Sequence, residues 1–135
     1  MIHILIITHG ELGKELLHTA EAIIGRQDSV ETLHLTQEES LASLGQRTGD
    51  ALNRSLDTDG ILILTDMLGG TPCNASLPFS TTHRVEIVSG VNLYMLISAL
   101  VNRKAFLLED LAHKVISDGQ KNIANVKEIF LNKLK

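Results

Sequence analysis

Residues Ile2–Glu11, IHILIITHGE, decide the fold that the sequence predicts. The run from Ile2 to Ile7 is almost wholly apolar and contains four isoleucines, which is typical of a strand buried on both faces. A strand is buried on both faces when helices cover the two sides of a parallel sheet. The sequence therefore predicts an α/β sheet in which Thr8-His9-Gly10 lies at the carboxyl end of a central strand.

Helical and strand patterns alternate along the rest of the chain. From Glu11, apolar residues recur at helical spacing until Gly25, and those expected on the inner side are Leu12, Leu16, Leu17, Ala20, Ile23 and Ile24. Further strands are predicted over Val30–Leu35, Ile61–Leu64 and Arg84–Val88. Further helices are predicted from Pro72, over Asn92–Val101, and over Leu107–Ile116, the last with Leu108, Leu111, Ala112, Val115 and Ile116 inward.

A helix start is also predicted between the second and third strands. Thr36-Gln37-Glu38-Glu39 has the form of a capping box, in which hydroxyl and carboxylate satisfy each other's terminal amides. The helix that follows is expected to turn four apolar residues inward, namely Leu41, Leu44, Ala51 and Leu52.

This alternation predicts a doubly wound three-layer α/β sandwich with a mainly parallel four-stranded sheet. No repeat, low-complexity tract or linker divides the chain, so residues 1–135 are expected to form a single domain. The tail from Lys121 to Lys135 is ambiguous, because Val126–Leu131 could extend a helix or form a last strand.

Composition excludes several functions. A net charge of −4 with no Lys/Arg cluster argues against nucleic-acid binding. Cys73 is the only cysteine, which excludes an intrachain disulfide and suits a reducing cytoplasm. The first apolar run follows no basic leader and is too short for a signal peptide or a membrane span, so a cytoplasmic protein is expected.

The candidate reactive group is His9. In a doubly wound sheet, ligands bind beyond the carboxyl ends of the strands, where the strand order reverses. His9 ends the first strand and Asp66 follows the third, so the two side chains should meet if these strands are neighbours. A neutral imidazole is a competent nucleophile, and a carboxylate on one ring nitrogen would fix its tautomer and leave the other nitrogen free.

Glycine-rich segments beside these residues suggest an oxyanion cradle. Gly10 allows close backbone approach before a helix start, and Gly69-Gly70-Thr71-Pro72 could supply backbone amides, a hydroxyl and a helix N-terminus. Such a cradle suits a phosphoryl group, although the Walker pattern is absent. Each part alone is common in turns and caps, so the prediction depends on their combination.

The remaining histidines and Cys73 are interpreted as structural or solvent-exposed residues. No histidine has Cys or acidic neighbours at metal-ligand spacing, so no metal site and no cofactor are expected. The residues concerned are His3, His18, His34, His83 and His113.

With these motifs the chain resembles the IIA component of the mannose-type family of the bacterial phosphoenolpyruvate-dependent sugar phosphotransferase system. The resemblance covers essentially the whole chain. The motifs that carry it are Thr8-His9-Gly10, Thr19-Ala20-Glu21 followed by Gly25, Asp66-Met67-Leu68-Gly69-Gly70-Thr71-Pro72-Cys73-Asn74, and Gly90-Val91-Asn92 followed by Met95-Leu96.

The resemblance implies a phosphocarrier. His9 would accept a phosphoryl group through Nε2 from the histidine-containing phosphocarrier protein and pass it to a IIB component, with Asp66 bonded to Nδ1 and Thr71 contacting the phosphate. The membrane IIC and IID components would be served only indirectly. The resemblance also implies a homodimer that exchanges a C-terminal strand, which would give Val126–Leu131 a role.

Two departures and three alternatives stay open. The chain stops at Lys135 where many relatives continue into a IIB domain, so a separate IIB protein is expected, and Leu68 stands where some relatives have tryptophan. The alternatives are a regulatory phosphoprotein without a transport role, the phosphotransferase subunit of dihydroxyacetone kinase, and a flavodoxin-like cofactor-binding module. The absence of Trp and the single Tyr94 argue against the last.

Overall fold

The structure, a computed structural model, describes all residues from Met1 to Lys135 and is built on a four-stranded sheet. The strands are β1 (His3–His9), β2 (Val30–Leu35), β3 (Ile61–Thr65) and β4 (Val85–Val88). Their order is β2-β1-β3-β4 and every neighbouring pair is parallel. The predicted doubly wound sheet is confirmed, and its order reverses between β1 and β3.

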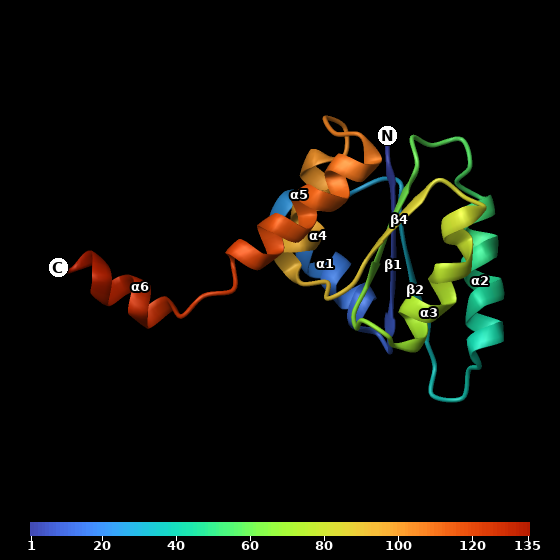
Figure 1. Cartoon of the computed structure of the whole chain (residues 1–135), viewed down its shortest axis with the longest axis horizontal. Coiled ribbons are helices and arrows are strands. Elements are labelled where there is room, and N and C mark those ends of the chain that lie inside the picture. Colours follow the sequence, from blue (N-terminus) through green and yellow to red (C-terminus); the bar gives the residue numbers. More distant parts are fainter.

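Helices cover both faces of this sheet (Figure 1). One face carries α1 (Leu12–Ile24), α4 (Leu93–Asn102) and α5 (Leu108–Lys121). The other carries α2 (Leu41–Asn53), α3 (Thr71–Ser76) and a short 3-10 helix (Leu77–Thr81). None of the helices is both long and apolar enough to span a membrane.

The isoleucine run of β1 separates two hydrophobic cores. Ile4 and Ile6 join the core beneath α1, α4 and α5, whereas Leu5 and Ile7 join the core beneath α2 and α3. All four side chains are fully buried, and each such burial contributes about 1.5–3 kcal/mol to folding. The period-two alternation of a strand thus explains why the whole run is apolar.

The predicted capping box is wrong. Helix α2 begins at Leu41, and its N-cap is Ser40, whose side chain accepts a 3.0 Å hydrogen bond from the Ser43 backbone N–H. The Glu39 side chain contacts Ser43 and Arg47, and the Glu39 N–H donates to the Thr36 carbonyl at 3.2 Å and not to the Thr36 hydroxyl, as a capping box requires. Serine is as good a cap as threonine, so local pattern alone did not separate the two starts.

Four residues predicted to face inward are exposed, two of them because they are the first residues of α1 and α2: Leu12, Ile23, Leu41 and Ile116. The last long helix also continues beyond Ile116 to Lys121.

The tail forms a helix, α6 (Val126–Lys133), which extends away from the three layers (Figure 1). The Asn125 side chain caps it by accepting a hydrogen bond from the Glu128 N–H at 3.1 Å, and none of its residues is buried. A C-terminal strand is therefore not present in the single chain, where this segment has no sheet edge as a partner. Its exchange between subunits stays a prediction.

Candidate functional site

His9 is the last residue of β1, at the edge of the sheet where the strand order reverses. Its side chain is 45% exposed, in contrast to the fully buried residues before it. The register pairs His9 with Leu35 on one side, and Ile7 with Thr65 on the other. The chain beyond Thr65 therefore passes directly beside the histidine.

Asp66 binds His9 twice, as the sequence predicted from the strand ends. Its Oδ2 lies 2.9 Å from the His9 backbone nitrogen and 2.9 Å from Nδ1 of the ring. An ionised carboxylate can only accept, so Nδ1 must donate and carry the ring proton. The lone pair of the neutral imidazole is then on Nε2, which is the nitrogen suited to nucleophilic attack.

Several effects act on the ionisation of Asp66. Its side chain is only 8% exposed, and this burial alone would raise its pKa. The hydrogen bonds from the backbone and ring of His9 outweigh burial and hold the pKa of Asp66 below its ordinary value. Asp66 thus stays ionised near neutral pH and can stabilise positive charge on the imidazole.

The glycine loop after β3 leaves room for the histidine ring. A Cβ on Gly70 would lie 3.1 Å from His9 Cε1, so a larger residue here would press on the ring. Gly69 has a φ of +78°, a conformation that L residues rarely adopt. Gly70 therefore leaves the space that the His9 ring occupies, whereas Gly69 allows the backbone turn before it.

The predicted amide cradle needs a correction at two positions. The Gly70 N–H donates to the Met67 carbonyl at 3.2 Å, and the Gly10 N–H donates to the Leu35 carbonyl at 3.1 Å. Both amides are thus already used in the backbone. Thr71, the first residue of α3, does line the pocket that His9 and Gly10 also line.

Thr8 supports the start of α1, a role that no sequence pattern predicts. Its buried hydroxyl accepts a 2.8 Å hydrogen bond from the Gly13 N–H, and it thereby satisfies an amide in the first turn of α1. Gly13 is needed there because a Cβ would come within 2.9 Å of Ile6 Cγ2. A threonine five residues before a helical glycine is not a recognised cap pattern, so no sequence signal announced this bond.

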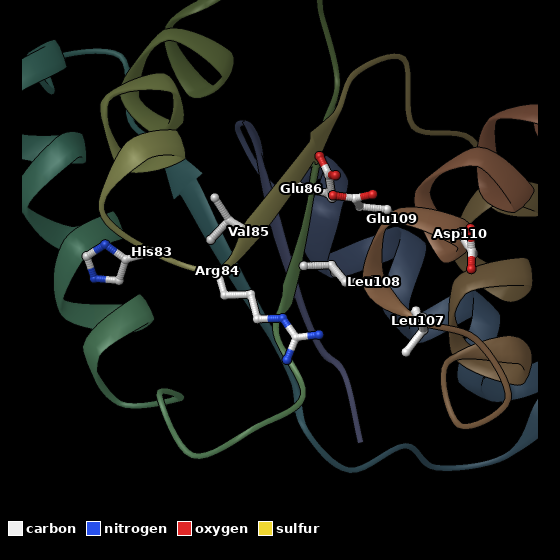
Figure 2. Close-up of a pocket in the computed structure, with 8 residues that line it drawn as sticks. All are labelled: His83, Arg84, Val85, Glu86, Leu107, Leu108, Glu109 and Asp110. Carbon is white, nitrogen blue, oxygen red and sulfur yellow. The ribbon is translucent and has the colours of Figure 1, made fainter.

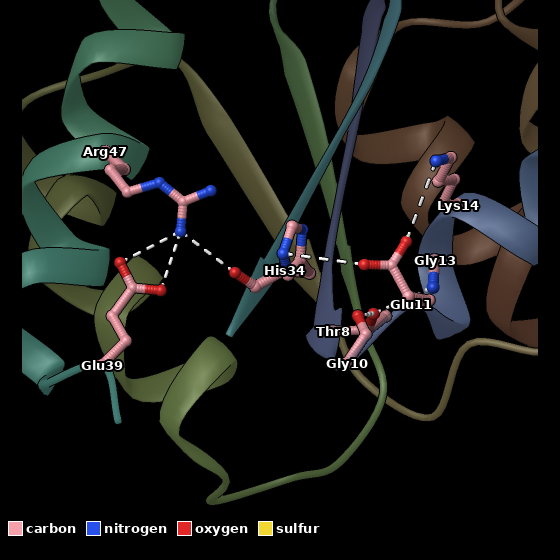
Figure 3. A network of polar contacts seen from close by, with 8 residues as sticks. All are labelled: Thr8, Gly10, Glu11, Gly13, Lys14, His34, Glu39 and Arg47. Atoms are coloured by element: carbon pink, nitrogen blue, oxygen red, sulfur yellow. Dashed lines mark hydrogen bonds and ion pairs between the residues drawn. The ribbon is translucent and has the colours of Figure 1, made fainter. Parts of the chain in front are cut away.

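A polar pocket of about 730 Å³ opens beside His9. The β1–α1 corner forms one wall, the β2–α2 loop forms the other, and both are rich in ion pairs (Figure 3). Glu39 accepts two hydrogen bonds from Arg47 Nη1, at 2.8 and 3.0 Å, and Arg47 also binds the His34 carbonyl at 3.0 Å. His34 and Glu39 line this pocket, although no sequence pattern predicts a role for them in the site.

A second pocket, of about 380 Å³, lies between the start of β4 and the start of α5 (Figure 2). It includes Val85, Glu86 and the first residues of α5, and no residue near His9. It lies along the free outer edge of β4, outside the strand ends that carry the candidate site.

Comparison with known proteins agrees with this geometry. Residues 3–116 match the family described as "PTS system fructose IIA component", where PTS is the phosphotransferase system. The chain belongs to this family. The members of this family are components of a phosphotransferase system for sugars.

Several relatives resemble this IIA component closely. The mannose-specific EIIAB component of Escherichia coli strain K12 is 34% identical over 103 residues, which are 76% of this chain and 32% of that protein. This chain thus spans about a third of that relative. The fructose-specific EIIA component of Bacillus subtilis is 28% identical over 136 residues, with 100% of this chain and 92% of the relative covered.

Solved structures have the same fold. The EIIA component from Streptococcus agalactiae superposes with a TM-score of 0.88 at 32% identity, covering 95% of this chain and 99% of that one. The mannose/sorbose-specific IIA subunit from Enterococcus faecalis has a TM-score of 0.86 at 26% identity, covering 92% and 93%.

Proposed function

We propose that this IIA component carries a phosphoryl group on His9. The observation that carries the proposal is the pair of 2.9 Å contacts from Asp66, which hold the ring in place and leave its proton on Nδ1. The exposed ring can then meet a partner protein with Nε2 unprotonated. Thr71 lines the same pocket, and we expect its hydroxyl to contact the phosphate.

The proposed step is a reversible in-line transfer between two histidines. Nε2 of His9 attacks the phosphorus of the donor's phosphohistidine, a nitrogen–phosphorus bond forms, and the donor's bond to phosphorus breaks with its electron pair returning to the donor ring. Asp66 stabilises the positive charge that develops on the His9 imidazole. The reverse process delivers the phosphoryl group to the acceptor.

The proposed donor is the histidine-containing phosphocarrier protein, and the proposed acceptor is a IIB component. Exposed apolar side chains stand beside the site for these contacts: Leu68 is 84% exposed and Met67 is 60% exposed, both in the loop between Asp66 and Gly69. A small apolar patch suits partners that must dissociate after each transfer. The membrane IIC and IID components would act only after IIB.

Phosphate labelling tests the proposal. The protein is incubated with phosphoenolpyruvate, the first enzyme of the system and the phosphocarrier, and an acid-labile, base-stable phosphate is measured. We expect the label in the wild type and in His18→Ala, an exposed control histidine, and none in His9→Ala. Uptake of the label by His9→Ala would contradict the assignment.

We further propose that the protein forms a homodimer through its C-terminal segment. Helix α6 has no buried residue; Val126 and Phe130 are exposed apolar side chains on it, and Leu134 is another at its C-cap. The outer edge of β4 has no strand beside it and opens into the pocket of Figure 2. Pairing of the partner's C-terminal segment with this edge would bond the free backbone groups of β4 and cover the apolar side chains of the tail.

A further inference from the structure

The wall of the His9 pocket contains a second imidazole, that of His34. Strand register places His34 opposite Thr8, one residue before His9, and both histidines line the same pocket. The His34 ring is 45% exposed and can therefore exchange protons with the solvent. Its Nε2 faces Glu11 Oε1 at 3.7 Å, as Figure 3 shows.

Two carboxylates lie near His34, and one of them, Glu11, has no short ion pair. On the α2 side, Glu39 is fully paired with Arg47, whose contact with His34 goes to the carbonyl and not to the ring. On the α1 side, Glu11 has only long contacts, at 3.7 Å to His34 and at 3.9 Å to Lys14. Such exposed pairs stabilise a fold little, so the charges of Glu11 and His34 can respond to a new charge in the pocket without loss of the fold.

Phosphorylation of His9 would change this balance. A phosphoryl group adds about −1.5 to −2 charge at neutral pH. It would enter a pocket whose border already carries Glu11 and Glu39, while Asp66 lies behind the ring. Of the groups at this border, the imidazole of His34 can gain a positive charge between pH 5 and 8.

We propose that His34 is a proton-linked positioning residue for the phosphorylated state, gaining a solvent proton when His9 is phosphorylated and releasing it when the group leaves. The protonated ring, beside Glu11 on the wall of the pocket that His9 lines, offsets the repulsion between that carboxylate and the phosphoryl group. This inference rests on the proposed function of His9. Its consequence is that the IIA component holds its phosphoryl group more strongly as the pH falls.

The first test follows His34 by NMR in the unmodified full chain. Histidine ring signals are titrated from pH 5 to 8.5 before and after phosphorylation with phosphoenolpyruvate, the first enzyme and the phosphocarrier. We expect the midpoint of the His34 titration to rise by about half a pH unit on phosphorylation. The midpoint of His18 should stay in place, because His18 forms a pair of the same 3.7 Å length with Glu15 outside the pocket.

The second test uses variants. The equilibrium of phosphoryl exchange with the phosphocarrier is measured from pH 5.5 to 8 for wild type, His34→Gln and the control His18→Gln. When the pH is lowered from 8 to 5.5, we expect the equilibrium constant for phosphorylation to rise about threefold more in the wild type and the control than in His34→Gln. Titration of the phosphoryl group itself affects all three proteins alike and cancels in the comparison.

The outcomes separate the two proposals. A chain that takes up no base-stable label on His9 contradicts the proposed function. A chain that is labelled normally, while the His34 midpoint does not move or His34→Gln follows the wild-type pH profile, overturns only the role of His34. The NMR titration needs no substitution, so it decides the point even if His34→Gln folds poorly.

Discussion

At the scale of single residues, the chemistry of the site depends on which ring nitrogen of His9 carries the proton. Replacing Asp66 by asparagine keeps the shape but removes the charge, and an amide can donate to Nδ1 and stabilise the wrong tautomer. We expect Asp66→Asn to slow phosphoryl uptake by at least about tenfold with the fold intact. Rapid-quench labelling measures the rate, and circular dichroism checks the fold. Asp57→Asn, at an exposed position, is the control, and equal rates in both variants would remove Asp66 from the mechanism.

Gly70 tests the steric part of the same site. Its φ of −76° suits any residue, so Gly70→Ala adds a methyl group without backbone strain. That methyl would lie 3.1 Å from His9 Cε1 and displace the ring. We expect labelling to slow by roughly tenfold, because small misplacements of a reacting group are costly.

The matched control is Gly45→Ala, in helix α2, where a Cβ meets nothing within 4 Å. This change should stabilise the protein by about 0.5–1 kcal/mol and leave the labelling rate unchanged. An equal labelling rate in the two alanine variants would show that the ring tolerates the contact.

His3 makes stability depend on pH. Burial lowers the pKa of His3, Arg103 and Arg54 add to this effect, and Glu31 opposes it. The ring bonds Ser29 Oγ through Nδ1 at 2.9 Å, while its buried Nε2 has no partner.

The unfolded chain therefore binds a proton on His3 at a higher pH than the folded chain does, and stability should fall as the pH drops below about 6.5. Urea unfolding at pH 5.5, 6.5 and 7.5 measures the free energy. His3→Asn should lose part of this pH dependence, whereas His113→Asn, exposed on α5, should retain it. Identical profiles for His3→Asn and the wild type would refute this origin.

At the scale of elements, the start of α2 distinguishes the sequence pattern from the structure. Ser40 caps the helix, and Thr36, the residue that the pattern favours, lies outside it. We expect Ser40→Ala to lower the free energy of unfolding by about 1 kcal/mol. Thr36→Ala should change it by less than about half of that, as is usual for a surface substitution. Urea titrations of both variants compare the two, and a larger loss in Thr36→Ala would restore the capping box.

The strands and most helices could be predicted because hydrophobic periodicity sets them directly. Ile61–Leu64 is apolar throughout and Ile2–Ile7 is apolar except for His3, and burial on two faces leaves few other conformations. The meeting of His9 and Asp66 followed from the rule for strand ends. The contact of Arg47 with the His34 carbonyl joins segments that only the folded chain brings together, and the bond from the Gly13 N–H to Thr8, although local, follows no known capping pattern.

At the scale of the whole molecule, the site and the proposed dimer surface occupy different parts of the fold. His9 lies at the carboxyl ends of the strands, whereas α6 leaves the body beyond α5 (Figure 1). A dimer formed through the tail therefore leaves His9 open to a partner protein. Phosphoryl transfer and assembly should then be separable by mutation.

The tail provides that separation. Ile129 and Phe130 are exposed apolar residues of α6. Exposed apolar patches commonly mark interaction sites, because a partner that covers them removes apolar surface from water. We expect the full chain to be dimeric by light scattering at micromolar concentration, and the double variant Ile129→Asp/Phe130→Asp to be at least about tenfold weaker in dimerisation, because each buried unpaired charge is costly. Lys127→Ser, on the same helix, is the control. Both variants should still accept phosphate on His9.

A monomeric wild type, or a double variant that dimerises as well as the wild type, would rule out the tail as the dimer surface. Loss of labelling in a dissociated but folded variant would instead show that the partner subunit supports the site.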